Sequence, residues 1–146
     1  MFRENQGCTS CSKQNCFINK YCSDPWKNII EKNKTIIVYQ ERQTIFSEQN
    51  VGFGVYFIND GKVKIFKTGK QDKHLIIRFS DSGDILGFKG YSEKYYSVSC
   101  TTLEKTIVCF LENKLFFSAI KENPEFALAL VQYYAMELAF SDFHQK

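Results

Sequence analysis

Histidine, long apolar runs and excess charge of one sign are all scarce in this sequence. Its 146 residues carry two histidines, two prolines and a formal net charge of +3. So small a charge, spread along the chain, argues against an electrostatic nucleic-acid surface. No apolar run approaches the roughly 18 residues that cross a bilayer, and residues 1–6 contain no signal-peptide core. We therefore expect a cytoplasmic protein with no membrane partner.

The scarcity of histidine also argues against catalysis. His74 and His144 have no Ser, Cys or carboxylate at a spacing that would build a nucleophile, its base and an orienting group. His74 lies in a strand-like run and fits a cross-strand surface position. We expect that the protein is not an enzyme.

The chain does contain enough apolar material for one domain, because 44% of it is hydrophobic and 16% aromatic. A chain of this length typically builds a single core without needing disulfides. Its composition divides it into three segments. These are a polar, cysteine-rich arm without core-forming periodicity (1–24), a β-rich roll (25–122) and a helix (123–146).

The middle segment has the pattern of an antiparallel β-protein. The clearest unit is Val55–Ile58 followed by Lys62–Phe66, on either side of an Asp60-Gly61 turn that tolerates positive φ. Similar runs at a spacing of about ten residues predict further strands at 36–39, 74–79, 96–101 and 105–110. Seven or eight such strands predict a mainly β jelly roll.

Helices are expected on both sides of the roll. After Pro25, Trp26, Ile29 and Ile30 would share one buried helix face, and residues 113–121 form a second short helix. Asn123 and Pro124 are a good N-cap and first position for a third, long helix.

The long helix carries apolar residues at alternating gaps of three and four. This seam consists of Phe126, Ala129, Tyr133, Met136, Phe140 and Phe143. Its other faces are also apolar, at Leu128, Leu130, Val131, Tyr134 and Leu138. A helix of this kind buries one side against its own domain and another against a partner, for which a second copy is the simplest candidate. We expect a homodimer.

One segment, residues 83–90 (Gly-Asp-Ile-Leu-Gly-Phe-Lys-Gly), is denser in glycine than any other. Glycines let the backbone approach a ligand, and successive N–H groups can bind a phosphate or carboxylate. By itself the pattern also fits a wide turn between two strands.

The order of four segments resembles the cyclic-nucleotide-binding-like sensor domain of Crp/Fnr transcription regulators. The segments are Gly54–Ile58, Asp60–Lys64, Gly83–Gly87 and Ile107–Phe110, and the likeness runs from about residue 8 to about residue 142. The Gly83–Gly87 element and the Cys-x2-Cys arm resemble the group common in Bacteroidetes. The resemblance implies a double-stranded β-helix, a phosphate-binding cassette over 83–97 and a C-terminal dimerisation helix. It also implies DNA contact only through a C-terminal helix-turn-helix that is absent from this chain.

The resemblance implies that the cassette of cyclic-AMP-binding members begins with Gly-Glu and carries an Arg-Ser pair. The cassette of this chain differs at both places. Here Gly83-Asp84 stands at the opening, and Tyr95-Tyr96 precedes Ser97 where the arginine is expected. An arginine–phosphate pair is commonly worth about 1.5–3 kcal/mol, so its loss weakens affinity by roughly one to two decades. A cyclic nucleotide or another small-molecule effector would be bound by Gly83, Asp84, Ile85, Leu86, Gly87, Tyr96 and Ser97.

The cysteines offer a second kind of sensor. Cys8, Cys11, Cys16 and Cys22 are spaced closely enough for one metal centre, and thiolates select zinc, copper(I) or iron–sulfur units. By resemblance to the Fnr branch, Cys8, Cys11, Cys16 and a distant Cys109 would hold a [4Fe–4S] cluster. This chain has one extra residue in the second gap, and Cys22 is additional.

Three alternatives to a cluster remain open for the cysteines. The first is a structural zinc on Cys8, Cys11, Cys16 and Cys22. The others are dithiol chemistry at Cys8 and Cys11, and Cys100 or Cys109 as small core residues. The sequence therefore predicts a ligand- or redox-sensing domain that pairs through its last helix, or a pairing module without a ligand.

Overall fold

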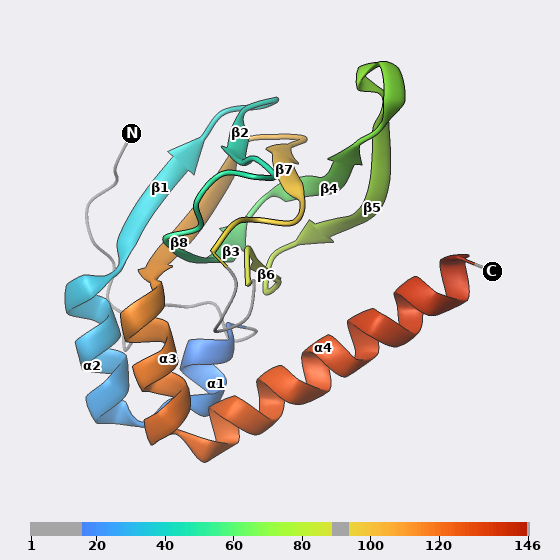
Figure 1. The fold of residues 1–146 in the computed structure, drawn as a ribbon. Coiled ribbons are helices and arrows are strands. Elements are labelled where there is room, and N and C mark those ends of the chain that lie inside the picture. The colour runs from blue at the N-terminus through green and yellow to red at the C-terminus, as the bar shows by residue number, and fades with distance from the viewer. Residues whose placement is uncertain (1–15, 89–93, 146) are drawn as a thin grey trace.

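The structure is a computed structural model that describes residues 16–88 and 94–145, with side chains up to Leu138. Within these residues eight strands form two four-stranded sheets, and helices gather at one end of the roll (Figure 1). The strands are β1 (Thr35–Tyr39), β2 (Thr44–Phe46), β3 (Gly54–Asp60), β4 (Lys62–Thr68), β5 (His74–Asp81), β6 (Ile85–Leu86), β7 (Ser99–Thr102) and β8 (Thr106–Glu112). The helices are α1 (Phe17–Tyr21), α2 (Asp24–Asn33), α3 (Asn113–Glu122) and α4 (Pro124–Gln145), with one 3₁₀ turn at Lys70–Asp72.

The two sheets have the orders β1-β8-β3-β6 and β2-β7-β4-β5, and every pairing is antiparallel. This confirms the predicted jelly roll. The strands on either side of the Asp60-Gly61 turn do not pair with each other, because β3 belongs to one sheet and β4 to the other. Gly61 has a φ of +119°, and a Cβ there would lie 2.4 Å from Thr106 Oγ1. The turn therefore needs glycine to carry the chain across the roll.

Most predicted strands are present, but the run 96–101 is strand only from Ser99 onward. Residues 96–98 instead line a cavity described below. β2 and β6 are three and two residues long, too short to be recognised from an alternating pattern.

The apolar residues form two clusters, one on each side of the β1-β8-β3-β6 sheet. β3 contributes to both, because successive side chains on a strand point to opposite faces. Val55 and Phe57 pack with the helices, together with Ile18, Ile30, Ile85 and Phe116, in what we call the helix-side cluster. Ile58 packs inside the roll with Val63, Ile65, Cys100 and Val108.

The cysteine-rich segment is not wholly an arm without core contacts, as its composition suggested. Its described end forms α1, where Ile18 is only 2% exposed and Cys22 is also buried in the helix-side cluster. The Phe17 ring meets Tyr133 of α4 edge-on, with centroids 5.2 Å apart. Ile18 and Cys22 therefore belong to the core. The helical pattern of five residues is too weak to predict this placement.

Helix α2 forms where Pro25 and the following apolar residues predicted it. Ile30 is completely buried and Trp26 packs against the helix-side cluster. The expected burial of Ile29 is wrong, since this side chain is 38% exposed. Because α2 covers only the end of the roll, it buries fewer of its apolar residues than the sequence pattern predicted.

Asn123 occupies the position before α4, as predicted, but its side chain does not act as expected for an N-cap. Its Oδ1 accepts a hydrogen bond from the Ser23 N–H (3.0 Å), and its Nδ2 donates to the Ala119 carbonyl (2.8 Å). The amide therefore joins the starts of α2 and α4 to the end of α3.

Helix α4 continues from this end beneath the strands to the C-terminus (Figure 1). Phe126, Ala129 and Tyr133 of the predicted seam face the protein's own core, whereas Met136 is exposed. The side chains of Phe140 and Phe143 lie outside the described residues. A second stripe with gaps of three, four and three residues is exposed: Leu128, Val131, Ala135 and Leu138.

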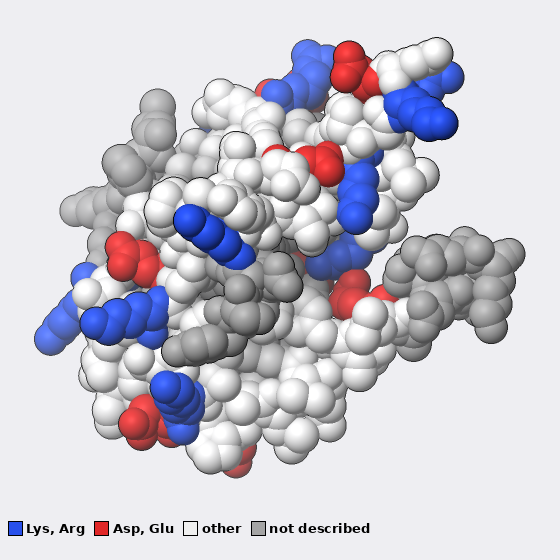
Figure 2. All heavy atoms as spheres, viewed as in Figure 1, with Lys and Arg blue, Asp and Glu red and all other residues white. Residues whose placement is uncertain are grey.

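The surface charges are mixed. On the face shown in Figure 2, the described Lys and Arg side chains are scattered among Asp and Glu and form no continuous basic patch. Within the part of the chain that the structure describes, no helix combines the length and apolar character that crossing a bilayer requires.

Candidate ligand-binding cavity

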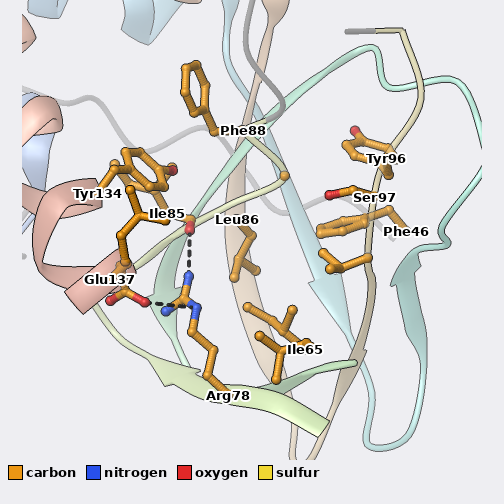
Figure 3. A pocket seen from close by; sticks show the side chains of 14 residues that line it. Phe46, Ile65, Arg78, Ile85, Leu86, Phe88, Tyr96, Ser97, Tyr134 and Glu137 are labelled. Atoms are coloured by element: carbon orange, nitrogen blue, oxygen red, sulfur yellow. Dashed lines mark hydrogen bonds and ion pairs between the residues drawn. The ribbon is translucent and has the colours of Figure 1, made fainter. Parts of the chain in front are cut away.

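A cavity of about 450 Å³ is enclosed by three parts of the fold (Figure 3). These are the β2-β7-β4-β5 sheet with residues 96–98, residues 85–88, and helix α4. This volume is within the usual range for small-molecule sites. Most of its wall is apolar, formed by Phe46, Ile65, Ile77, Ile85, Leu86, Phe88, Val98 and Leu138. Polar groups come from Arg78, Tyr96, Ser97, Tyr134 and Glu137.

Five of the seven ligand residues predicted from the sequence line this cavity: Ile85, Leu86, Gly87, Tyr96 and Ser97. Gly83 and Asp84 do not. Gly83 has a φ of +94° in the turn after β5, where its N–H donates to the Ile58 carbonyl. The Asp84 carboxylate accepts hydrogen bonds from the Asp81 N–H (2.9 Å) and the Tyr133 hydroxyl (3.2 Å). Asp84 therefore holds the turn to α4 and is turned away from the cavity lining.

Gly87 brings the backbone close to the aromatic wall. Its φ is +80°, and a Cβ would lie 3.2 Å from Tyr96 Cε1 and 3.4 Å from Tyr56 Cδ1. The Tyr96 hydroxyl donates to the Gly54 carbonyl (3.0 Å), and its ring stacks on Phe46 at 4.4 Å. Burial raises the pKa of Tyr96. Tyr96 thus offers a ligand its ring rather than its proton.

Arg78, the charged residue at the other end of the cavity, was not predicted from the sequence. Its Nε lies 3.1 Å from Glu137 Oε2, and its Nη1 donates to Ser80 Oγ (2.6 Å). Nη2 approaches the Ile85 carbonyl at 3.5 Å (Figure 3). The two charged side chains are 18% and 30% exposed, so the ion pair between β5 and α4 is largely screened from water. A lone arginine within the apolar run 75–79 was the available signal.

Residues 36–123, which include most of this cavity, match the family described as "Cyclic nucleotide-binding domain". The chain belongs to this family. The cyclic nucleotide-binding domain here also shares 26% identity over 103 residues with the "Transcriptional activatory protein AadR" of Rhodopseudomonas palustris. That alignment covers 70% of this chain and 42% of AadR, so the chain spans less than half of that relative.

Solved structures show the same fold. The catabolite activator protein of Thermus thermophilus superposes with a TM-score of 0.73 at 19% identity, covering 88% of this chain and 61% of that one. The sensor domain of the regulator DNR from Pseudomonas aeruginosa gives 0.73 at 15% identity, covering 86% and 85%. These matches fit a Crp/Fnr-type sensor domain, as the sequence resemblance implied. The family and fold are those of regulators and nucleotide-binding domains.

Helix α4 also carries a buried hydroxyl next to the cavity. The Tyr134 oxygen is buried and has no hydrogen-bond partner among the described residues. Burial raises the pKa of Tyr134 well above its ordinary value, so the group stays protonated. Its ring packs 5.1 Å from Phe88, which in turn meets Phe116. A buried donor without a partner costs free energy.

The described cysteines do not by themselves fit a metal centre. Cys16, Cys22 and Cys109 all belong to or contact the helix-side cluster. Among the described residues, however, no three His, Cys, Asp or Glu side chains gather closely enough to bind a metal ion. Cys8 and Cys11 lie outside the described residues. Cys100 is fully buried, and burial raises its pKa to about 12, which confirms its role as a core residue.

Proposed function

We propose that this domain is the effector-sensing part of a transcription regulator, in which a small molecule in the cavity changes the position of α4. The proposal rests mainly on one observation. Tyr134, Glu137 and Leu138 of α4 form one wall of the cavity, so a ligand there contacts the helix directly. The similarity to AadR, whose name describes a transcriptional activator, supports a role in gene regulation.

Helix α4 would transmit the signal through a homodimer. The exposed stripe of Leu128, Val131, Ala135 and Leu138 has the three-and-four spacing of a helix–helix seam. Two copies that pair along this stripe would shift relative to each other when a ligand moves α4. DNA contact would belong to a further domain, since the chain spans 42% of AadR.

A cyclic nucleotide is not the effector that the cavity favours. Most of the wall is apolar, and Arg78 is the only Lys or Arg among the described residues that line it. Tyr95 and Tyr96 stand where the family's arginine is expected, and the Tyr96 hydroxyl already donates to the Gly54 carbonyl. The ribose hydroxyl and the purine nitrogens of a cyclic nucleotide would therefore lose their hydrogen bonds to water with few replacements.

Thermal denaturation tests the effector proposal. Wild-type protein is melted with cyclic AMP, cyclic GMP and a panel of acidic, neutral and basic small molecules at millimolar concentration. A ligand at about a hundred times its Kd stabilises by about 2.7 kcal/mol and raises Tm by several degrees. Hits are then examined by hydrogen exchange over residues 124–138.

A matched pair of variants locates the binding. Ser97 is exposed at the cavity, so Ser97→Trp should obstruct it, while Glu104→Trp adds the same ring to an exposed turn elsewhere. We expect a compound that binds in the cavity to stabilise wild type and Glu104→Trp but not Ser97→Trp, and to change the hydrogen-exchange rates of α4. The proposal fails if no compound class gives this combination of results.

A redox sensor is the second candidate, favoured by the gathering of Cys16, Cys22 and Cys109 at one cluster. Protein prepared without oxygen would be analysed for iron, zinc and visible absorption, before and after reconstitution with iron and sulfide. Metal bound in proportion to protein and lost in a Cys16→Ser variant would support this function. Colourless, metal-free protein whose α4 exchange is identical when oxidised and reduced would exclude it.

A further inference from the structure

We infer that the cavity binds an organic monoanion with an apolar body, whose acidic group takes the place of Glu137 at Arg78. This inference rests on the effector function proposed above and specifies the ligand class. Three features of the site carry it: an apolar wall, an arginine fixed more firmly than its partner, and a buried hydroxyl without an acceptor.

The wall determines the body of the ligand. Ile65, Ile77, Ile85, Leu86 and Phe88 supply aliphatic and aromatic surface but no side-chain hydrogen-bonding group. A ligand with many hydroxyl or amide groups would lose its bonds to water without replacing them. The cavity therefore favours a hydrocarbon or aryl body with polarity confined to one end.

Arg78 and Glu137 differ in how firmly each is held. Arg78 extends from β5 and keeps two contacts besides the ion pair, to Ser80 Oγ and the Ile85 carbonyl. Glu137 lies on α4, is more exposed, and has its ion pair only with Arg78 among the described residues. A competing anion would therefore displace the glutamate, whose carboxylate can turn to water, and leave the guanidinium in place.

The charge at this end of the cavity favours a monoanion. Asp84 lies close enough to Tyr133 and Arg78 to act on both electrostatically, and it stays in its turn through the Asp81 N–H. A monoanion that replaces Glu137 leaves the total charge of the site unchanged. A dianion would add a charge beside Asp84 and be repelled.

Tyr134 would supply the second polar contact once α4 moves, because its hydroxyl has almost no accessible surface before that movement. Its buried hydroxyl lies on the same helix as Glu137, three residues earlier, and the residue lines the same cavity (Figure 3). A carboxylate has two oxygens, so one ligand can accept from both the guanidinium and a nearby donor. Binding would then exchange a contact that holds α4 to β5 for one that holds α4 to the ligand.

Isothermal titration calorimetry tests the inference with hexanoate, octanoate, decanoate and 4-phenylbutyrate, each beside its primary amide, and with cyclic AMP. At least one carboxylate should bind about tenfold tighter than its amide, because the amide lacks the charge that Arg78 recognises. Arg78→Gln should abolish this preference, and Arg42→Gln, which removes an exposed arginine, should not.

Glu137→Gln should change the carboxylate affinity in the opposite direction from Arg78→Gln. Removal of the competing carboxylate should raise carboxylate affinity by about three- to tenfold, whereas a merely structural ion pair would give no gain. Circular dichroism melts establish that each variant folds. If Arg78→Gln does not fold, Arg78→Lys and the gain from Glu137→Gln decide the question.

The inference is overturned if the amides bind as tightly as the carboxylates, if cyclic AMP binds more tightly than every carboxylate, or if no carboxylate binds wild type or Glu137→Gln. A neutral or basic compound that stabilises wild type, fails with Ser97→Trp and alters α4 would leave the effector function standing. Such a result separates failure of this ligand class from failure of the proposed function.

Discussion

Two neighbouring tyrosines of α4 show how differently one residue type can contribute. The Tyr133 hydroxyl donates to Asp84 (3.2 Å) and lies 3.4 Å from the Ile85 N–H, whereas the buried Tyr134 hydroxyl has no described partner. We expect Tyr133→Phe to lower the free energy of unfolding by about 1–2 kcal/mol. Tyr134→Phe should change it by less than about 0.5 kcal/mol or stabilise the fold. Urea denaturation of both variants measures the difference, and equal losses would contradict it.

Cys100 allows a chemical test of the roll's interior. Because burial raises its pKa to about 12, roughly one thiol in ten thousand is ionised at pH 8. Native protein treated with iodoacetamide at that pH should leave Cys100 unmodified while the partly exposed Cys16 and Cys109 react. Mass spectrometry reads out the sites, and treatment in guanidinium chloride is the control in which all six cysteines react. Rapid native labelling of Cys100 would show that the roll opens readily.

The residues that line the cavity differed in how well the sequence predicted them. Gly87 stood out, because glycine has an unusual conformational range that marks a turn or a close approach. Arg78 did not, since a single charge in a strand is typical of an edge strand facing water. Only the approach of α4, more than fifty residues later, gives this arginine its partner Glu137.

At the scale of elements, Asn123 connects three helices. Its side chain satisfies the Ser23 N–H and the Ala119 carbonyl, and the residue is buried. Asn123→Ala would leave two backbone groups unpaired and should cost about 2–4 kcal/mol of stability. Asn33→Ala is the matched control, because Asn33 Nδ2 makes the same kind of bond to Ile29 four residues earlier, but at the surface. Its loss should cost less than about 0.5 kcal/mol in the same denaturant titration. Similar costs for the two variants would mean that burial does not matter here.

Most elements could be predicted because they repeat a simple pattern. β3, β4 and β8 have apolar stretches bounded by turn residues, and α2 and α4 begin at recognisable prolines. The pairing of strands was not predictable in the same way. The turn at Asp60-Gly61 is equally compatible with a hairpin and with a crossing between sheets, and the contacts with Thr106, distant in sequence, decide between them. Helix α1 is too short for its periodicity to be visible, so its burial was missed.

At the scale of the whole molecule, α4 has more apolar surface than its own domain can cover. The core takes Phe126, Ala129 and Leu130, which are almost completely buried. Leu128 and Val131 remain 59% and 65% exposed on the other side, and Leu138, at the edge of the cavity, is 65% exposed. The sequence indicated a helix apolar on several faces, but which of these faces is buried and which is exposed depends on the angle at which α4 crosses the roll.

The predicted homodimer follows from that exposed side. Val131→Glu would place a charge in the middle of the stripe, and burying it against a second copy would be unfavourable. We expect the variant to be monomeric at concentrations where wild type sediments as a dimer, with an unchanged circular dichroism spectrum. Leu103→Glu is the matched control, since it places the same charge at a partly exposed apolar residue on the turn between β7 and β8. Sedimentation equilibrium distinguishes the states. If wild type is a monomer, or if Val131→Glu stays dimeric, α4 does not pair along this stripe, and the cavity must signal through another surface.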